Sequence, residues 1–217
     1  MRPRSLSQRS PWPRPPSPSR LPKRYRLKLQ RSPSPTHRVA LTGGIGAGKS
    51  EALKAFERGG AAVCSSDEIV HRLIAEDPEV RAALEERFGT TDRSRIGEIV
   101  FADRAELEWL EQLLHPRVRA EYQRWVDDLD ESTEVAVAEI PLLYETGGER
   151  LFDAVVVVTA PEEVRAARRP GWPVAQRSGR LIPDAEKVQR ADYAYVNDGS
   201  LDDLDAFVGS VLEDLRR

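Results

Sequence analysis

Cysteine, histidine and long apolar runs are scarce in this 217-residue chain. The single cysteine, Cys64, excludes an internal disulfide and a cluster of thiolate metal ligands. The three histidines, His37, His71 and His115, lie far apart in the sequence, which argues against a metal site built from histidines. No apolar run approaches the roughly 18 residues of a membrane-spanning helix. We therefore expect a cytoplasmic protein without a membrane segment.

Acidic residues are absent from residues 1–38, which hold 11 of the 33 basic residues and 9 of the 16 prolines. Such a segment buries too little apolar surface to offset its ordering entropy, so residues 1–37 are predicted to be a disordered tail. The tail lacks the apolar stretch of a signal peptide. It shares the composition of organelle transit peptides. Alternatively, it could lie upstream of the true translation start. It could contact RNA or acidic lipid. The rest of the chain has 22 basic residues against 36 acidic ones, which argues against general nucleic-acid binding.

From residue 39 onward, short apolar runs alternate with helical patterns. Strands are predicted at residues 39–42, 61–64, 135–138, 154–158 and 192–196. Helices are predicted at residues 49–58, 68–88, 103–129 and 201–215. Residues 164–190 are polar, rich in arginine and interrupted by prolines. Buried strands alternating with helices indicate an α/β fold in which helices cover both faces of a parallel sheet.

Residues 43–50 read Gly-Gly-Ile-Gly-Ala-Gly-Lys-Ser, which fits the pattern G-x-x-x-x-G-K-[ST] between a predicted strand and a predicted helix. Glycines let successive backbone N–H groups turn inward around an anion, and the start of the helix adds its positive dipole end. Lys49 is expected to neutralise the β- and γ-phosphates, and the Ser50 hydroxyl to ligate Mg²⁺. The alternative is a glycine-rich turn with an exposed lysine. The predicted ATP-binding residues of this loop are Gly44, Ile45, Gly46, Ala47, Gly48, Lys49 and Ser50.

Two carboxylates lie at or just past the ends of predicted strands. In open α/β sheets, ligands bind at the edge formed by the carboxyl ends of the strands. Asp67 lies just past the second strand, where it could accept or orient the proton of an attacking hydroxyl, or instead cap the helix that follows. Glu139 ends the third strand, where it could hold Mg²⁺ through water or shape an acceptor pocket. The alternative for Glu139 is a solvated strand-end charge.

Several short strings follow one another over about residues 39–212: Leu41–Ser50, Asp67 after the second strand, Phe88-Gly89, Val100-Phe101, Leu110–Pro116, Pro141–Glu145, Ala191–Tyr193, and Asn197 before Gly199-Ser200. In this order they resemble the dephospho-coenzyme A kinase family. The resemblance implies a P-loop kinase fold over residues 38–217, with a helical acceptor-binding subdomain at about 69–129 and an arginine-rich lid at about 162–188. It also implies transfer of a phosphoryl group from ATP, with Mg²⁺, to the ribose 3′-hydroxyl of dephospho-coenzyme A, which is the last step of coenzyme A biosynthesis.

The resemblance also assigns roles to single residues. The implied catalytic residues are Asp67 as the base, Lys49 and Arg177. The implied acceptor-binding residues are Asp67, His115, Glu139 and Leu142. Asn197 is implied to contact the adenine end of ATP, and the alternative is an ordinary turn residue. For His115, the alternative is a cap on a helix that ends before Pro116.

Several positions depart from the family's pattern. Ser65 stands where the family commonly has a first Asp, Glu139 stands where it commonly has Asp, and Glu51 replaces a small or hydroxyl residue. In the lid, Arg177 and Lys187 keep the family's register, but Leu181 stands at the glutamine position and residues 165–177 look several residues short. The lid arginines are Arg165, Arg168, Arg169, Arg177 and Arg180, any of which could be merely solvated. Lid arginines stabilise the negative charge of the transferring phosphoryl group. We therefore expect these departures to affect turnover more than ATP binding. The alternatives are a nucleotide-binding module with impaired catalysis and another P-loop small-molecule kinase.

Overall fold

The computed structural model describes residues 36–168 and 182–217. The strands are β1 (His37–Thr42), β2 (Ala62–Ser65), β3 (Val135–Glu139), β4 (Ala154–Thr159) and β5 (Tyr193–Val196). The helices are α1 (Lys49–Arg58), α2 (Ser66–Glu76), α3 (Pro78–Phe88), α4 (Arg93–Ala102), α5 (Arg104–Asp127), α6 (Glu162–Arg168), α8 (Asp184–Arg190) and α9 (Leu201–Leu215), with the short 3₁₀ helix η3 (Gly148–Leu151). The predicted tail lies outside the described residues except for Thr36 and His37. Residues 169–181 of the predicted lid also lie outside them, and this segment includes Arg169, Arg177, Arg180 and Leu181.

All five strands are parallel and follow the order β2-β3-β1-β4-β5. The central strands β1, β3 and β4 are rich in valine and alanine and buried along most of their length. Such continuous apolar strands are typical of a parallel sheet covered on both faces, because neither face meets water. The predicted α/β fold is therefore confirmed, as is the P-loop kinase arrangement of a parallel sheet flanked by helices.

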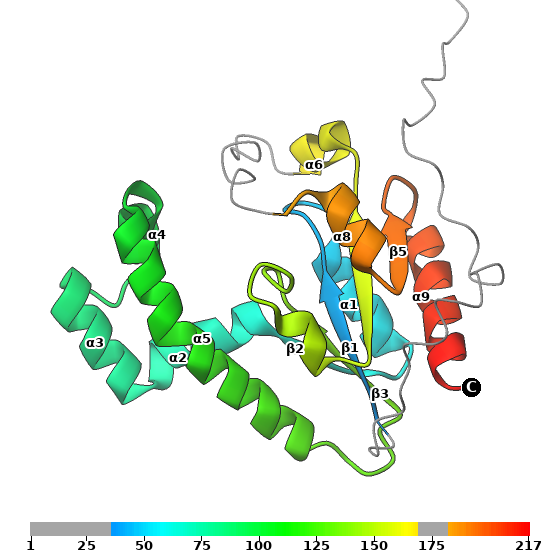
Figure 1. Ribbon diagram of the computed structural model, residues 1–217, viewed down its shortest axis with the longest axis horizontal. Helices are drawn as coiled ribbons and strands as arrows, with labels where there is room; N and C mark the ends of the chain where they lie inside the picture. The colour runs from blue at the N-terminus through cyan, green and yellow to red at the C-terminus, as the bar shows by residue number, and fades with distance from the viewer. Residues whose placement is uncertain (1–35, 169–181) are drawn as a thin grey trace, which may run out of the picture.

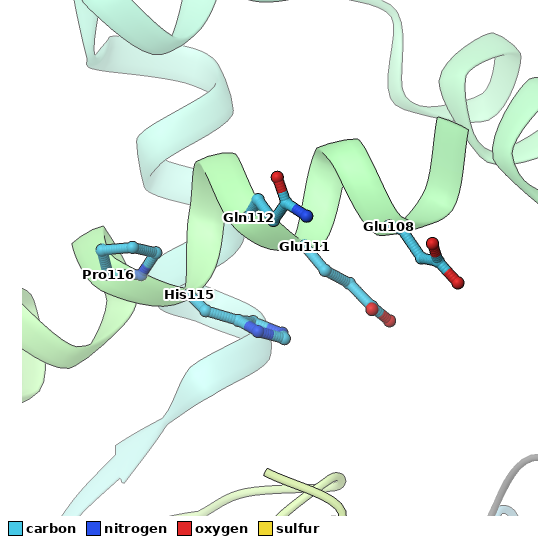
Figure 2. A pocket seen from close by; sticks show the side chains of 5 residues that line it. All are labelled: Glu108, Glu111, Gln112, His115 and Pro116. Carbon is cyan, nitrogen blue, oxygen red and sulfur yellow. The ribbon is translucent and has the colours of Figure 1, made fainter. Parts of the chain in front are cut away.

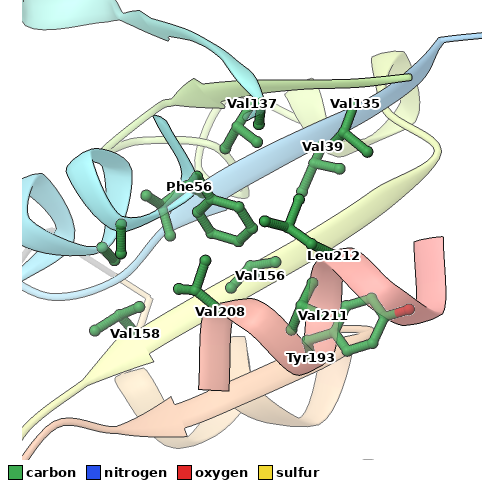
Figure 3. Close-up of a cluster of buried hydrophobic side chains, with 14 of the residues drawn as sticks. Val39, Phe56, Val135, Val137, Val156, Val158, Tyr193, Val208, Val211 and Leu212 are labelled. Atoms are coloured by element: carbon green, nitrogen blue, oxygen red, sulfur yellow. The ribbon is translucent and has the colours of Figure 1, made fainter. Parts of the chain in front are cut away.

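Helices α1 and α9 pack side by side on one face of the sheet. Figure 3 shows Phe56 of α1 and Leu212 of α9 meeting the valines of β1, β3 and β4. Helix α9 begins at a capping box in which Ser200 and Asp203 exchange hydrogen bonds, and its apolar residues recur at helical spacing. The other face is covered by α8 and by the chain that follows β3, through a second cluster that includes Leu143, Tyr144 and Val188.

Helices α2–α5 form an arm that projects to one side of the sheet (Figure 1). The arm has its own apolar cluster, in which Phe88 and Trp109 meet edge to face with ring centroids 5.3 Å apart. Aspartates start three of its helices: the side chains of Asp77, Asp92 and Asp103 each accept a hydrogen bond from the first turn. The single helix predicted over residues 68–88 is wrong, because Asp77 and the proline after it end α2 and start α3. Helix α4 was not predicted.

Strand register brings the carboxyl ends of three strands to one edge of the sheet. Glu139, the last residue of β3, lies opposite Leu41 of β1 and Ser65 of β2. The chain segments that leave β1, β2 and β3 therefore start at the same level, on the edge where open α/β sheets bind ligands. Within the described residues, we find no helix with both the length and the apolar character that crossing a membrane requires.

Candidate active site

The loop between β1 and α1 has a shape that only glycine permits. Gly43, Gly46 and Gly48 have φ angles of +146°, +75° and +97°. A Cβ atom on Gly43 would lie 1.8 Å from the Val158 carbonyl oxygen, and one on Gly48 would lie 2.2 Å from Asn197 Nδ2. The loop ends at the first turn of α1, so its backbone N–H groups and the helix dipole converge on one anion site. Lys49 folds back over the loop, where its Nζ donates a 3.2 Å hydrogen bond to the Gly44 carbonyl.

Charges of both signs surround the Lys49 ammonium. Burial lowers the pKa of Lys49, while Glu139 and Asp67 oppose that shift and the nearby Lys187 adds to it. Burial likewise raises the pKa of Glu139; Lys49 opposes this shift, and the neighbouring carboxylates Asp67 and Glu68 add to it. The alternative of an exposed lysine on a simple turn is therefore wrong. The site combines a half-buried cation with carboxylates from two neighbouring strand ends.

The two predicted carboxylates occupy different environments. Asp67 is exposed in the first turn of α2, and Ser65 is the N-cap of that helix, so the helix-cap alternative for Asp67 is wrong. Glu139 is only 6% exposed, so the alternative of a solvated charge is wrong as well. The Ser66 hydroxyl donates to the Glu139 carbonyl at 2.9 Å and holds the start of α2 against the end of β3. An exposed carboxylate thus lies beside a buried one.

Asn197 packs against the back of the glycine-rich loop. Its Nδ2 donates to the Ala47 carbonyl at 2.9 Å, and its side chain is buried. Arg168 donates to the same carbonyl at 3.3 Å and to the Asn197 carbonyl at 3.2 Å. The alternative of an ordinary turn residue is wrong for Asn197. A contact of this residue with the adenine end of ATP stays a prediction.

A second pair of charges lies directly over Gly44. Arg165 of α6 is paired with Asp184 of α8 at 3.4 Å, and the Thr159 hydroxyl donates to the same carboxylate at 3.0 Å. A Cβ atom on Gly44 would lie 2.7 Å from Asp184 Oδ2 and 2.8 Å from Arg165 Nη1. Arg165 is therefore held against the loop and is not merely solvated. Sequence reasoning missed Asp184 and Thr159; the position of Thr159 at the end of β4 was the only signal that could have found either.

His115 lies on the arm, in the middle of α5. Its side chain lines an open hollow of about 390 Å³ together with Glu108, Glu111, Gln112 and Pro116, residues that helical spacing places on one side of α5 (Figure 2). Because α5 continues past Pro116 to Asp127, the helix-cap alternative for His115 is wrong. The Arg117 guanidinium donates to the Leu113 carbonyl at 2.9 Å, within the turn that the proline interrupts.

The predicted acceptor residues come from two parts of the molecule. His115 lies in the middle of the arm, whereas Glu139 and the half-buried Leu142 lie at the edge of the sheet. Asp67 lies in the first turn of α2, where the arm leaves that edge. The structure thus brings Lys49, Asp67 and Glu139 together beside the phosphate loop. Arg177 lies outside the described residues.

Oxygen ligands for a divalent cation are present at the loop. Ser50 is exposed in the first turn of α1, and Asp67 and Glu139 provide carboxylates at the same edge. No cluster of three or more His, Cys, Asp or Glu side chains suited to a metal occurs in residues 36–168 and 182–217. Mg²⁺ at kinase sites is held by one or two protein oxygens, by water and by the phosphates themselves. The donor set therefore fits a magnesium ion that arrives with a nucleotide.

The sequence and the structure are both similar to those of known proteins. A sequence model of the dephospho-CoA kinase family matches residues 37–203. The dephospho-CoA kinase of Mesorhizobium japonicum is 40% identical over 189 residues, which cover 82% of this chain and 96% of that protein. A crystal structure from Thermus thermophilus has a TM-score of 0.71 and 31% identity, covering 83% of this chain and 98% of the other. The dephospho-CoA kinase from Campylobacter jejuni has a TM-score of 0.59 and 25% identity, covering 84% of this chain and 98% of the other. The chain belongs to the dephospho-CoA kinase family.

Proposed function

We propose that this kinase transfers the γ-phosphoryl group of ATP to the ribose 3′-hydroxyl of dephospho-coenzyme A, which yields coenzyme A and ADP in the last step of coenzyme A biosynthesis. The observation that carries the proposal is the meeting of the glycine-rich loop, Lys49, Asp67 and Glu139 at one edge of the sheet. Family membership supports the choice of acceptor, since the relatives are named for it.

The phosphate side of the proposal uses the loop and its lysine. The loop N–H groups and Lys49 hold the β- and γ-phosphates, and Ser50 is the protein ligand of Mg²⁺. A magnesium ion held there would supply positive charge that offsets the negative charge developing during transfer. Arg165 and Arg168 place guanidinium groups beside the same loop, where they can add positive charge. Arg177 completes the proposed catalytic set, although it lies outside the described residues.

The acceptor side of the proposal uses the carboxylates. Asp67 accepts the proton of the 3′-hydroxyl as the hydroxyl oxygen bonds to the γ-phosphorus and the bond to the β-phosphate oxygen breaks. The exposure of Asp67 suits this role, because an acceptor must reach the carboxylate from solvent. Glu139 and Leu142 shape the acceptor pocket at the sheet edge, and His115 contributes from the arm.

The proposal includes the domain boundaries predicted from the sequence: a tail over residues 1–37, a kinase domain over 38–217, an acceptor arm at about 69–129 and a lid at about 162–188. A cytoplasmic location also stays a prediction. Of the lid departures that motivated a catalytically impaired module, Leu181 lies outside the described residues, and so do residues 169–177 of the stretch that looks short. Residues 36–168 and 182–217 give that alternative no support of their own.

The test is ADP release from ATP and Mg²⁺ with three acceptors, using the full chain and residues 38–217. Dephospho-coenzyme A should support release, whereas adenosine should support little and coenzyme A none, because its 3′-hydroxyl is already phosphorylated. The shorter protein should be equally active. If the protein binds ATP but dephospho-coenzyme A does not increase ADP release, the proposed acceptor is contradicted.

A further inference from the structure

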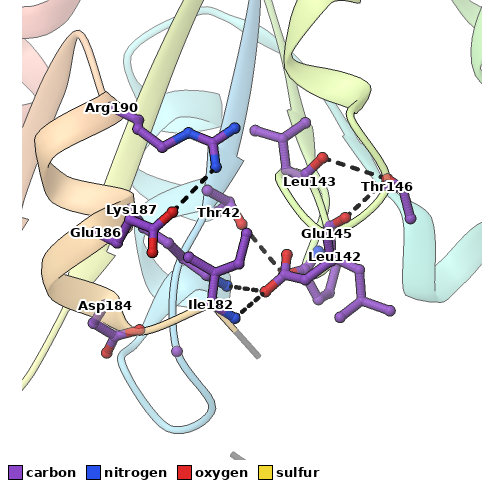
Figure 4. A network of polar contacts seen from close by, with 12 residues as sticks. Thr42, Leu142, Leu143, Glu145, Thr146, Ile182, Asp184, Glu186, Lys187 and Arg190 are labelled. Carbon is purple, nitrogen blue, oxygen red and sulfur yellow. Dashed lines mark hydrogen bonds and ion pairs between the residues drawn. The ribbon is translucent and has the colours of Figure 1, made fainter. Parts of the chain in front are cut away.

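Helix α8 is joined to the chain that follows β3 by two ion pairs. Lys187 Nζ lies 2.8 Å from Glu145 Oε1, and Arg190 Nη2 lies 2.8 Å from Glu149 Oε1. Lys187 and Arg190 are three residues apart and share one face of α8. Figure 4 shows Lys187 and Ile182 converging on Glu145. We call the pair Lys187–Glu145 the inner pair and Arg190–Glu149 the outer pair.

The two pairs differ in their contact with water. The outer pair is partly solvated, with side chains 36% and 25% exposed, whereas in the inner pair Lys187 is fully buried and Glu145 is 13% exposed. Within the described residues, Lys187 Nζ has no partner besides Glu145 Oε1, and the second carboxylate oxygen of Glu145 accepts no hydrogen bond. Burying two charges with incomplete hydrogen bonding costs much of the free energy that their attraction returns. Net stability is therefore a poor explanation for the inner pair.

The inner pair does join two parts of the candidate site. Glu145 lies one turn after Leu142, in the loop 140–147, and the Thr146 N–H donates to the Leu142 carbonyl at 3.1 Å. Glu145 Oε1 also accepts the Ile182 N–H at 3.0 Å, just before α8. The Glu145 carboxylate therefore connects the turn that carries Leu142 to the start of α8.

Lys187, the other member of the inner pair, lies on the helix that contacts the phosphate loop. Lys187 lies one turn after Asp184, which accepts a hydrogen bond from Thr159 and pairs with Arg165 directly over Gly44. Lys187 is also close enough to Lys49 to affect the pKa of that residue. Helix α8 thus touches the phosphate loop through Asp184 and the loop 140–147 through Lys187.

We propose that Glu145 and Lys187 are positioning residues, whose buried ion pair fixes the loop 140–147, and with it Leu142, relative to the phosphate-binding loop. This inference rests on the proposed function, in which Leu142 contacts dephospho-coenzyme A. Loss of the pair then misplaces the acceptor relative to the γ-phosphate. ATP binding changes little, because the loop 43–50 keeps its own contacts with Asn197 and Arg168.

The experiment compares variants that remove charge and keep side-chain size. Glu145→Gln keeps an acceptor for the Ile182 N–H but leaves the Lys187 charge alone, and Lys187→Met leaves the Glu145 charge alone. The double variant Glu145→Gln/Lys187→Met contains neither buried charge. Glu149→Gln in the outer pair is the matched control, since it makes the same chemical change on the same side of α8. For each protein, Tm, the Kd for ATP and the steady-state constants for dephospho-coenzyme A are measured.

We expect each single variant to lower Tm and the double variant to recover it, because no lone charge stays buried. In the recovered double variant, kcat/KM for dephospho-coenzyme A should still be lower by about ten- to hundredfold, the effect of a small misplacement of reacting groups. The Kd for ATP should stay within about twofold of the wild type, and Glu149→Gln should match the wild type in all constants, as expected for a solvated pair.

A double variant with wild-type constants would mean that the pair serves stability alone, and this would overturn the inference. An equal loss of kcat/KM in Glu149→Gln would also overturn it, since any loosening of α8 would then suffice. If the wild type releases no ADP with dephospho-coenzyme A, the proposed function fails and the inference fails with it. If the wild type is active and the double variant matches it, only the inference about the inner pair fails, and the proposed function stands.

Discussion

The side-chain amide of Asn197 donates a 2.9 Å hydrogen bond to the backbone carbonyl of Ala47, a residue 150 positions earlier in the chain. Arg168 donates to the same carbonyl, so the segments after β4 and β5 both support the glycine-rich loop. The amide nitrogen also occupies the space next to Gly48 in which a Cβ atom would lie. The shape of the phosphate loop therefore depends on residues outside its own sequence motif.

Gly48→Ala should weaken ATP binding. The new Cβ would lie 2.2 Å from Asn197 Nδ2 at a φ of +97°, so the loop must distort and the contact with Asn197 must break. Strain of this kind costs about 1–3 kcal/mol, which corresponds to about a ten- to hundredfold rise in Kd. The control is Gly209→Ala in α9, where a Cβ meets open space. That change should leave ATP binding intact and raise stability by about 0.5–1 kcal/mol. Calorimetric titration and thermal unfolding measure both effects, and unchanged ATP affinity in Gly48→Ala would contradict the account of the loop.

Lys49→Ala should weaken ATP binding and lower kcat by at least about a hundredfold, because the charge facing the transferred phosphoryl group is lost. Lys54→Ala is the control, since Lys54 lies on the exposed side of the same helix and pairs with Glu51 at the surface. Its constants should equal those of the wild type. Equal losses in the two variants would indicate damage to α1 and not loss of a phosphate contact.

Asp67→Asn should lower kcat by about 10²- to 10⁴-fold, the usual contribution of a general base, while the Kd for ATP stays near the wild-type value. Glu68→Gln removes the neighbouring exposed carboxylate and should change turnover little. Single-turnover measurements with saturating ATP separate the chemical step from binding. Full turnover in Asp67→Asn would show that another group takes the proton.

Glu139→Gln should change how stability depends on pH. Burial raises the pKa of Glu139 in the folded protein, so the folded state binds more protons than the unfolded chain between the two pKa values. The stability of the wild type therefore falls as pH rises from the unfolded pKa of about 4.3 to the higher folded value, and the penalty is complete above it. The variant lacks this penalty, so its stability relative to the wild type should increase across that window. Urea unfolding between pH 4 and pH 8 tests this, and a difference independent of pH would contradict it.

Much of the fold was readable from the sequence because local signals coincide with the elements. Helices α1 and α9 were predicted at their observed bounds, since apolar residues recur at helical spacing in both and a glycine-rich loop precedes α1. The valine runs likewise predicted β3 and β4 to within one residue. Helix α4 was missed because it buries only Ile96, which leaves little apolar periodicity to detect.

The surroundings of single charges were much less predictable. Lys187 stands in a short, polar helix and looks like a surface residue in the sequence. Its complete burial depends on Glu145, which the fold brings to it from the loop after β3. The same holds for Glu139, whose burial depends on how β3 fits between β1 and β2. Contacts between segments far apart in the chain decide the environment of a charged residue, and no local pattern records them.

The place of β1 in the sheet has a consequence for local unfolding. This strand is hydrogen-bonded to β3 on one side and to β4 on the other, and residues Val39–Thr42 are fully buried. Amide hydrogens in such a central strand exchange with solvent only in rare, large-scale openings. We therefore expect the phosphate loop to start from one of the most slowly exchanging parts of the protein. Its cradle is shaped before any nucleotide arrives, so little of the binding free energy is lost to ordering it.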